Sequence, residues 1–213
     1  MRVQALVVAE SASPVLAGLG LGIALASAPG PVQAVLMGEA VRGGVARGLR
    51  AMAGANLTFG LLLVLLALGL SIAPPSGLTL RILNVVGGVL LLWLAVEGFR
   101  AAGRATEATS ERRQLPPAIR GSLAVILNPG AWLFLGAVAS PLFASASEQG
   151  GTSAALFAAG ALVIGLAIGD GAVVLLGLGV RRAGDRTAVW VRRGLALVLA
   201  GLGLWLVIRG VVG

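Results

Sequence analysis

Apolar residues fill most of the chain in long runs, and six of these runs are long enough to cross a bilayer as helices. A bilayer core about 30 Å thick needs roughly 20 apolar residues per helix. Pro and Gly residues that are typical of turns fall at positions 74–77, 116–117 and 150–151. The pattern predicts an all-α integral membrane protein. Its predicted spans are residues 14–37, 48–70, 78–99, 118–143, 152–180 and 188–208.

The composition agrees with a membrane protein and excludes several kinds of chemistry. The chain is 58% hydrophobic and 11% charged, whereas about a quarter of the residues of a soluble domain are charged. It has no Cys and no His, which excludes disulfides, thiol catalysis, HExxH zinc sites and Ser-His catalysis. A rhomboid-like protease would need Ser plus His, and a presenilin-like one would need two facing aspartates. We therefore expect no enzyme, no cofactor and no metal site.

The arginines predict how the chain is oriented. Thirteen of the sixteen lie between the first and second, the third and fourth, and the fifth and sixth spans, or within the first six residues of the span that follows. The positive-inside rule places these segments in the cytoplasm and both termini outside, with residues 1–13 as a short uncleaved tail. The net charge of +8 is thus an orientation signal, and we expect no nucleic-acid partner. These arginines are Arg42, Arg47, Arg50, Arg100, Arg104, Arg112, Arg113, Arg120, Arg181, Arg182, Arg186, Arg192 and Arg193.

The two halves of the chain resemble each other. Pro29-Gly30 corresponds to Pro129-Gly130, residues 66–69 to 176–179, and residues 93–98 to 205–210. Each half holds three predicted spans, and an odd number requires the second half to be inverted in the membrane. We expect one transmembrane domain built from two inverted three-helix repeats, at about 14–99 and 118–211, joined by an Arg-rich cytoplasmic loop at about 100–117. Inverted repeats are typical of secondary transporters.

Helix breakers stand inside the first and fourth spans, at residues 28–31 and 128–130. Proline removes a backbone donor and frees carbonyl groups, which must then face protein, water or a ligand. The ends of broken helices attract anions and cations, as a zwitterionic solute requires. A tolerated proline kink is the alternative. We expect the two breaks to approach each other and to line one substrate cavity, through Pro29, Gly30, Pro31, Gln33, Asn128, Pro129 and Gly130.

Few polar side chains fall inside the predicted spans. Asp170 is the one acid well inside a span, and a charged carboxylate there costs a few kcal/mol, so we expect it to be protonated, paired or exposed to a water-filled cavity. We interpret Asp170 as the group that couples transport to an ion. Asn56 in the second span is a candidate substrate ligand or a hydrogen-bonding group between helices. Glu97 and Arg209 lie at span ends, where long side chains reach the lipid headgroups.

The chain resembles the LysE-type translocators, which export amino acids such as lysine, threonine and homoserine. The resemblance depends on Pro29-Gly30-Pro31, on the spacing of Gly44, Gly48 and Gly54, and on Asn128-Pro129. It covers nearly the whole chain at the level of six spans and a basic central loop. Family members usually have Asn after the Pro-Gly-Pro motif and Lys after Asn-Pro, where this chain has Val32 and Gly130.

This resemblance implies a secondary exporter in the bacterial cytoplasmic (inner) membrane. Its solute would be small and polar, an amino acid or derivative, and the proton gradient would drive export. The implied partners are this solute, protons or cations, and the lipid bilayer; whether the chain forms a homo-oligomer stays open. The alternative is export of a metal cation or another solute on the same fold, although a soft metal would favour Cys, His and Met ligands. A passive membrane scaffold would need neither paired breaks nor a buried acid.

Overall fold

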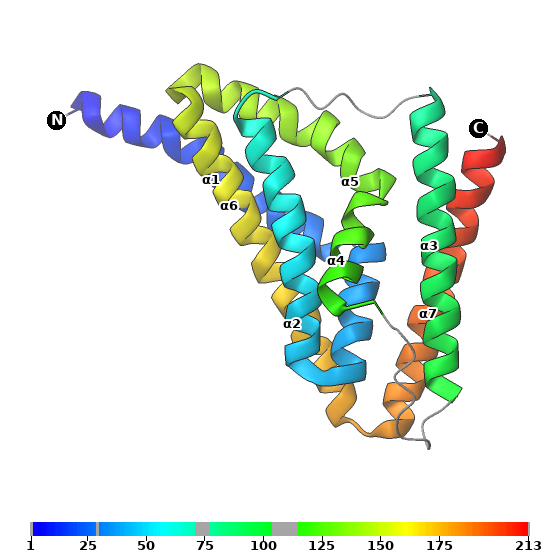
Figure 1. Ribbon diagram of the computed structural model, residues 1–213. Helices are drawn as coiled ribbons and strands as arrows, with labels where there is room; N and C mark the ends of the chain where they lie inside the picture. Colours follow the sequence, from blue (N-terminus) through cyan, green and yellow to red (C-terminus); the bar gives the residue numbers. More distant parts are fainter. Residues whose placement is uncertain (1, 29, 71–76, 104–114, 213) are drawn as a thin grey trace. The chain divides into compact units, whose positions relative to one another are not determined.

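The computed structural model describes residues 2–28, 30–70, 77–103 and 115–212, and these residues form helices without any strand (Figure 1). The helices are α1 (Arg2–Ser27), α2 (Pro31–Ala67), α3 (Gly77–Gly103), α4 (Pro117–Ile126), α5 (Pro129–Phe134), the π-helix η1 (Leu135–Ala139), α6 (Ser140–Arg182) and α7 (Asp185–Val212). Short breaks follow α1, α4 and α6, whereas α5, η1 and α6 follow one another directly.

Four of the described stretches are long and apolar enough to cross a membrane: Pro31–Ala67, Gly77–Glu97, Pro129–Arg182 and Arg186–Val212. Two shorter apolar helices, Pro14–Ser27 and Pro117–Ile126, precede the two predicted breaks. Helix α1 ends at Ser27 and α2 begins at Pro31, while α4 ends at Ile126 and α5 begins at Pro129. The predicted breaks are confirmed, because proline is tolerated at the first turn of a helix but not in its interior.

Helices α2 and α6 each contain a sharp kink at glycine. Gly44 has φ 76° and ψ −170°, and Gly151 has φ 70° and ψ −171°. This backbone region is essentially restricted to glycine, so each kink requires that residue. The kinks divide α2 and α6 into two helices each, and the one in α6 falls at the turn predicted from Gly150-Gly151.

The chain forms two compact units. Unit 1 comprises Met1–Ala28, Asn56–Pro75 and Gly130–Asp170, and unit 2 comprises Pro29–Ala55, Ser76–Pro129 and Gly171–Gly213. Unit 1 thus contains α1 with the later part of α2 and most of α6. Unit 2 contains the first part of α2 with α3, α4, the end of α6 and α7.

In unit 1, α1 packs closely on α6. A Cβ atom added at Gly18 or Gly22 would collide with the backbone of α6 around Ala158 and Leu162. One added at Gly165 would in turn collide with the backbone of α1 at Leu19. Small residues at these positions let the two backbones touch, as in other membrane helix pairs.

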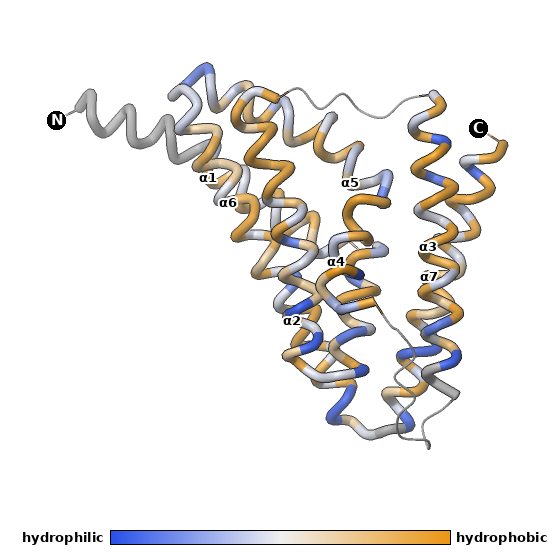
Figure 2. Tube along the Cα trace, viewed as in Figure 1, coloured by the Kyte–Doolittle hydropathy of each residue, from blue (hydrophilic) through white to orange (hydrophobic). Residues whose placement is uncertain are grey.

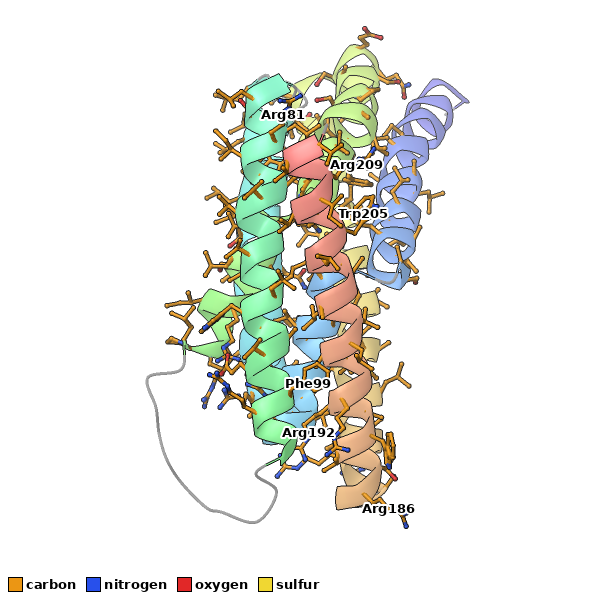
Figure 3. The ribbon with its side chains drawn as sticks, turned by 90° about the vertical axis from the view of Figure 1, so that its right-hand side faces the viewer. Arg81, Phe99, Arg186, Arg192, Trp205 and Arg209 are labelled. Atoms are coloured by element: carbon orange, nitrogen blue, oxygen red, sulfur yellow. The ribbon has the colours of Figure 1, made fainter. Side chains whose placement is uncertain are left out.

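In unit 2, α3 and α7 lie side by side and antiparallel (Figures 1 and 3). Figure 3 shows Arg81 and Arg209 near one end of the pair, and Phe99 and Arg192 near the other. Gly88 and Gly203 form the contact reciprocally: a Cβ atom on Gly88 would lie 2.6 Å from the Gly203 carbonyl oxygen, and one on Gly203 would lie 2.8 Å from that of Gly88.

Helix α4 is held against α2 within the same unit. A Cβ atom at Gly121 would collide with the backbone at Ala51, and one at Gly54 would collide with the backbone at Ala118. Ser122 Oγ donates a hydrogen bond of 3.1 Å to the Gly54 carbonyl oxygen. This contact fixes the position of α4, which carries Arg120 into the interior of unit 2.

Apolar side chains cover the exposed flanks of α3 and α7, as a lipid environment requires. Figure 2 shows hydrophilic residues concentrated where α3 ends and α7 begins. Charged side chains of α2, α3 and α4 form the cluster described below.

Candidate functional site

Five charged side chains form one ion-pair cluster inside unit 2. Arg120 Nη1 lies 3.0 Å from Glu39 Oε1, and Arg120 Nη2 lies 2.5 Å from Glu97 Oε1. Arg42 Nη1 lies 3.4 Å from Glu97 Oε1 and 3.8 Å from Glu39 Oε1, and Arg47 pairs with Glu39 through Nε. The cluster joins α2, α3 and α4 on both sides of the Gly44 kink.

The centre of this cluster is almost completely withdrawn from solvent. The side chains of Arg120 and Glu39 are 2% and 3% exposed. Arg120 Nε also donates to the Leu115 carbonyl oxygen at 3.0 Å, and its guanidinium carbon lies 5.8 Å from the ring centroid of Trp93. Buried charges must be paired and hydrogen-bonded, and Arg120 satisfies both conditions.

The cluster corrects two expectations from the sequence. Glu97 does not extend to the headgroups but pairs with Arg42 and Arg120. Asp170 is also not the one acid withdrawn into the helices, because Glu39 is buried as well. Hydropathy places Glu39 just beyond the first span, but α2 continues through this position to the kink. The sequence feature that indicates this ion pair is the three-residue spacing of Glu39 and Arg42, which brings the two side chains together on one helix.

A cavity of about 40 Å³ adjoins the cluster within unit 2. Its charged lining comes from Glu39 and Arg42 on α2, Arg120 on α4 and Arg192 on α7. The remaining wall is apolar and comes from α2, α3 and α7. Among the described residues, no group of three or more Asp, Glu, His or Cys side chains could hold a metal ion.

Asp170 and Asn56 are brought together in unit 1. Asp170 is 1% exposed, and the Asn56 amide lies near enough to act on its carboxyl group as a hydrogen-bond donor. The geometry is not that of a completed hydrogen bond. Within the described part of the chain, Asn56 Nδ2 and Asp170 Oδ1 are buried without a hydrogen-bond partner. Buried polar atoms are seldom left in this state unless they have a function or contact water.

The other predicted site residues are divided between the two units. Gly30, Pro31, Gln33, Asn128 and Pro129 belong to unit 2, whereas Gly130 belongs to unit 1. Gln33 and Asn128 are partly buried and Pro129 is buried. That the two breaks line one cavity stays a prediction. Pro29 lies outside the described residues.

Comparison with known proteins gives one match. The LysE type translocator family matches residues 23–210, from within α1 almost to the end of α7. No curated protein and no solved structure matches the chain. The matched region contains both helix breaks, both glycine kinks, Asp170 and the ion-pair cluster. Since the match extends over most of the chain, the protein belongs to the LysE-type translocator family.

Proposed function

We propose that this translocator is a secondary exporter of a small polar solute, an amino acid or a derivative, driven by the proton gradient across the bacterial inner membrane. Family membership supports the export of a solute. The observation that carries the coupling proposal is Asp170, an acid that is 1% exposed within a helix long and apolar enough to cross a membrane.

Asp170 has the surroundings of a group that gains and loses a proton. A charged carboxylate at the centre of a membrane helix costs about 2.5–3.5 kcal/mol on insertion scales. Of Glu148 and Asp170, the two acids of unit 1 whose side chains the structure describes, only Asp170 is buried, and Asn56 is its polar neighbour. Asp170 Oδ1 and Asn56 Nδ2 have no hydrogen-bond partner, and a proton on the carboxyl group or a bound water molecule would supply the missing hydrogen bonds. We infer that proton binding at Asp170 drives the cycle.

The proposed architecture is two inverted repeats, and the order of local features supports it. Each half has an apolar helix, a break before proline, a helix with a glycine kink, and a final helix of 27 or 28 residues. The two kinks have nearly the same backbone angles, with φ and ψ of 76° and −170° at Gly44 and of 70° and −171° at Gly151. Repeats with equivalent breaks are typical of secondary transporters.

We propose that the solute binds at the two broken helix ends. Helix α2 begins at Pro31 and presents the positive end of its dipole there, whereas α4 ends at Ile126 and presents the negative end of its dipole. An amino acid carries both charges, so its carboxylate suits the first end and its ammonium group suits the second. Gln33 and Asn128 add side-chain donors and acceptors beside these ends.

Counterflow in proteoliposomes tests the solute assignment. Vesicles containing the purified protein are loaded with one unlabelled solute, and uptake of the labelled solute is followed with no gradient applied. A panel of amino acids, amino-acid derivatives and metal cations should give uptake above that of protein-free vesicles for at least one amino acid or derivative. Uptake of a cation with none of these would overturn the assignment in favour of cation export.

A further inference from the structure

The cavity beside the ion-pair cluster carries more positive than negative charge. Its lining and the cluster together contain four arginines and two glutamates. Glu39 and Glu97 are already shared among Arg42, Arg47 and Arg120. The formal surplus is therefore two positive charges, taking four minus two.

Arg192 supplies one of the two positive charges that the glutamates do not neutralise. It lines the cavity from α7, and its Nε donates to the Ala188 carbonyl oxygen at 3.2 Å. Among the described residues, no acid forms an ion pair with it. A carbonyl oxygen takes one donor but does not cancel a full charge, so a mobile anion at this position would be stabilised.

The cavity is partly open and has room for a small occupant. Its free space of about 40 Å³ exceeds the roughly 10–15 Å³ that one water molecule needs. Chloride or the carboxylate of a small acid has suitable dimensions, and guanidinium groups bind carboxylates through paired hydrogen bonds. The apolar part of the wall makes an uncompensated charge there costly and anion binding favourable.

We propose that this cavity is a binding site for a small monovalent anion, either chloride or a carboxylate group, held by Arg192 together with Arg42 and Arg120. Asp170, which belongs to unit 1, is not among the residues that line this site. Its existence does not depend on which solute is exported or on how export is driven.

Thermal unfolding of the purified protein in detergent tests this proposal. Ionic strength is held constant with the bulky anion 2-(N-morpholino)ethanesulfonate, which is replaced stepwise by chloride, formate or acetate. An anion that binds only the folded state should raise the unfolding temperature along a saturating curve, by about 3–10 °C at a hundred times its Kd. The same unfolding measurement is repeated with increasing concentrations of alanine. A saturating shift with alanine would identify the carboxylate of an amino acid as the occupant, and a shift with the small anions but not with alanine would identify a free anion.

Two variants with matched controls locate the site. Arg192→Gln removes one of the two surplus charges, the one on the arginine that has no acidic partner, and Arg193→Gln removes a neighbouring exposed arginine that does not line the cavity. Gly38→Val places a side chain in the cavity, because Gly38 lines it and a Cβ atom there meets nothing within 4 Å. Gly194→Val is its control, since a Cβ atom at this exposed position also meets nothing within 4 Å and Gly194 is not in the lining.

The saturating shift should persist in Arg193→Gln and Gly194→Val and disappear in Arg192→Gln and Gly38→Val, each first checked for a monodisperse elution profile. If Arg192→Gln does not fold, Gly38→Val alone decides the matter. The proposal is overturned if no small anion gives a saturating shift in the unaltered protein. It is also overturned if Gly38→Val keeps the full shift.

Discussion

The Arg120 guanidinium lies 3.0 Å from the carboxylate of Glu39, and the two side chains are 2% and 3% exposed. This pair connects α4, a helix of 10 residues, to the first part of α2. Since Glu97 of α3 forms an ion pair with the same guanidinium, Arg120 connects α2, α3 and α4 of unit 2.

Breaking this pair from one side should destabilise the protein strongly. Glu39→Gln leaves Arg120 and Arg47 without one of their acids, and removing one partner of a buried pair costs about 3–5 kcal/mol. The free energy of unfolding in detergent should fall by that order. The exposed control Arg193→Gln loses only a contact of its guanidinium with the Trp190 ring, at 5.9 Å, and should change it by no more than about 1 kcal/mol.

The double variant Glu39→Gln with Arg120→Gln then tests whether the two residues act as a pair. Residues in contact are not additive, so the double variant should lose less stability than the sum of the two single changes. Strictly additive losses would show that the two side chains contribute independently, and an unaffected Glu39→Gln protein would contradict the buried ion pair itself.

The contact between α3 and α7 should tolerate no side chain at its centre. In Gly203→Ala the new methyl group would lie 2.8 Å from the Gly88 carbonyl oxygen, so the helices must separate. Overpacking of this kind costs about 1–3 kcal/mol. Gly201→Ala is the control on the same helix, since its Cβ atom meets nothing within 4 Å, and thermal unfolding of both variants makes the comparison. Equal stability of the two would refute the close approach.

The arginines of three separate segments meet at one end of unit 2, which gives a test of orientation. Arg192 lines the same cavity as Arg42 and Arg120, and the Arg181 guanidinium lies near Gly44. The positive-inside rule predicts that this end is cytoplasmic. The chain has no cysteine, so single cysteines can be labelled without background.

In whole cells, a membrane-impermeant thiol reagent should label Val212→Cys from outside and should label Thr187→Cys only after permeabilisation. Both residues are exposed, at the end and the start of α7 respectively. Labelling of Thr187→Cys alone in intact cells would reverse the orientation.

The helices and their breaks could be predicted from the sequence because long apolar runs and prolines have local physical consequences. Residues 188–208 were expected to form the last span, and α7 occupies Asp185–Val212. The breaks before Pro31 and Pro129 follow from the missing backbone donor of proline. No comparable local signal marks the π-helix Leu135–Ala139.

The ion-pair cluster could not be predicted because its members are far apart in the sequence. Glu39 and Arg120 are separated by 81 residues. Hydropathy places Glu39 in a connection and Arg120 near the start of the fourth predicted span, so it gives no reason to expect the two side chains to meet. The proximity of Asn56 to Asp170 could not be predicted from local sequence either, since the two residues are far apart in the chain.

Flux under an imposed pH gradient tests the central claim most directly, namely that Asp170 couples export to protons. Asp170→Asn keeps the size of the side chain and its capacity for hydrogen bonds but cannot titrate. In proteoliposomes, the variant should insert normally and retain counterflow of the transported solute, while accumulation driven by the pH gradient should fall to the level of protein-free vesicles. Gradient-driven accumulation equal to that of the unaltered protein would show that Asp170 is structural and that the coupling group lies elsewhere.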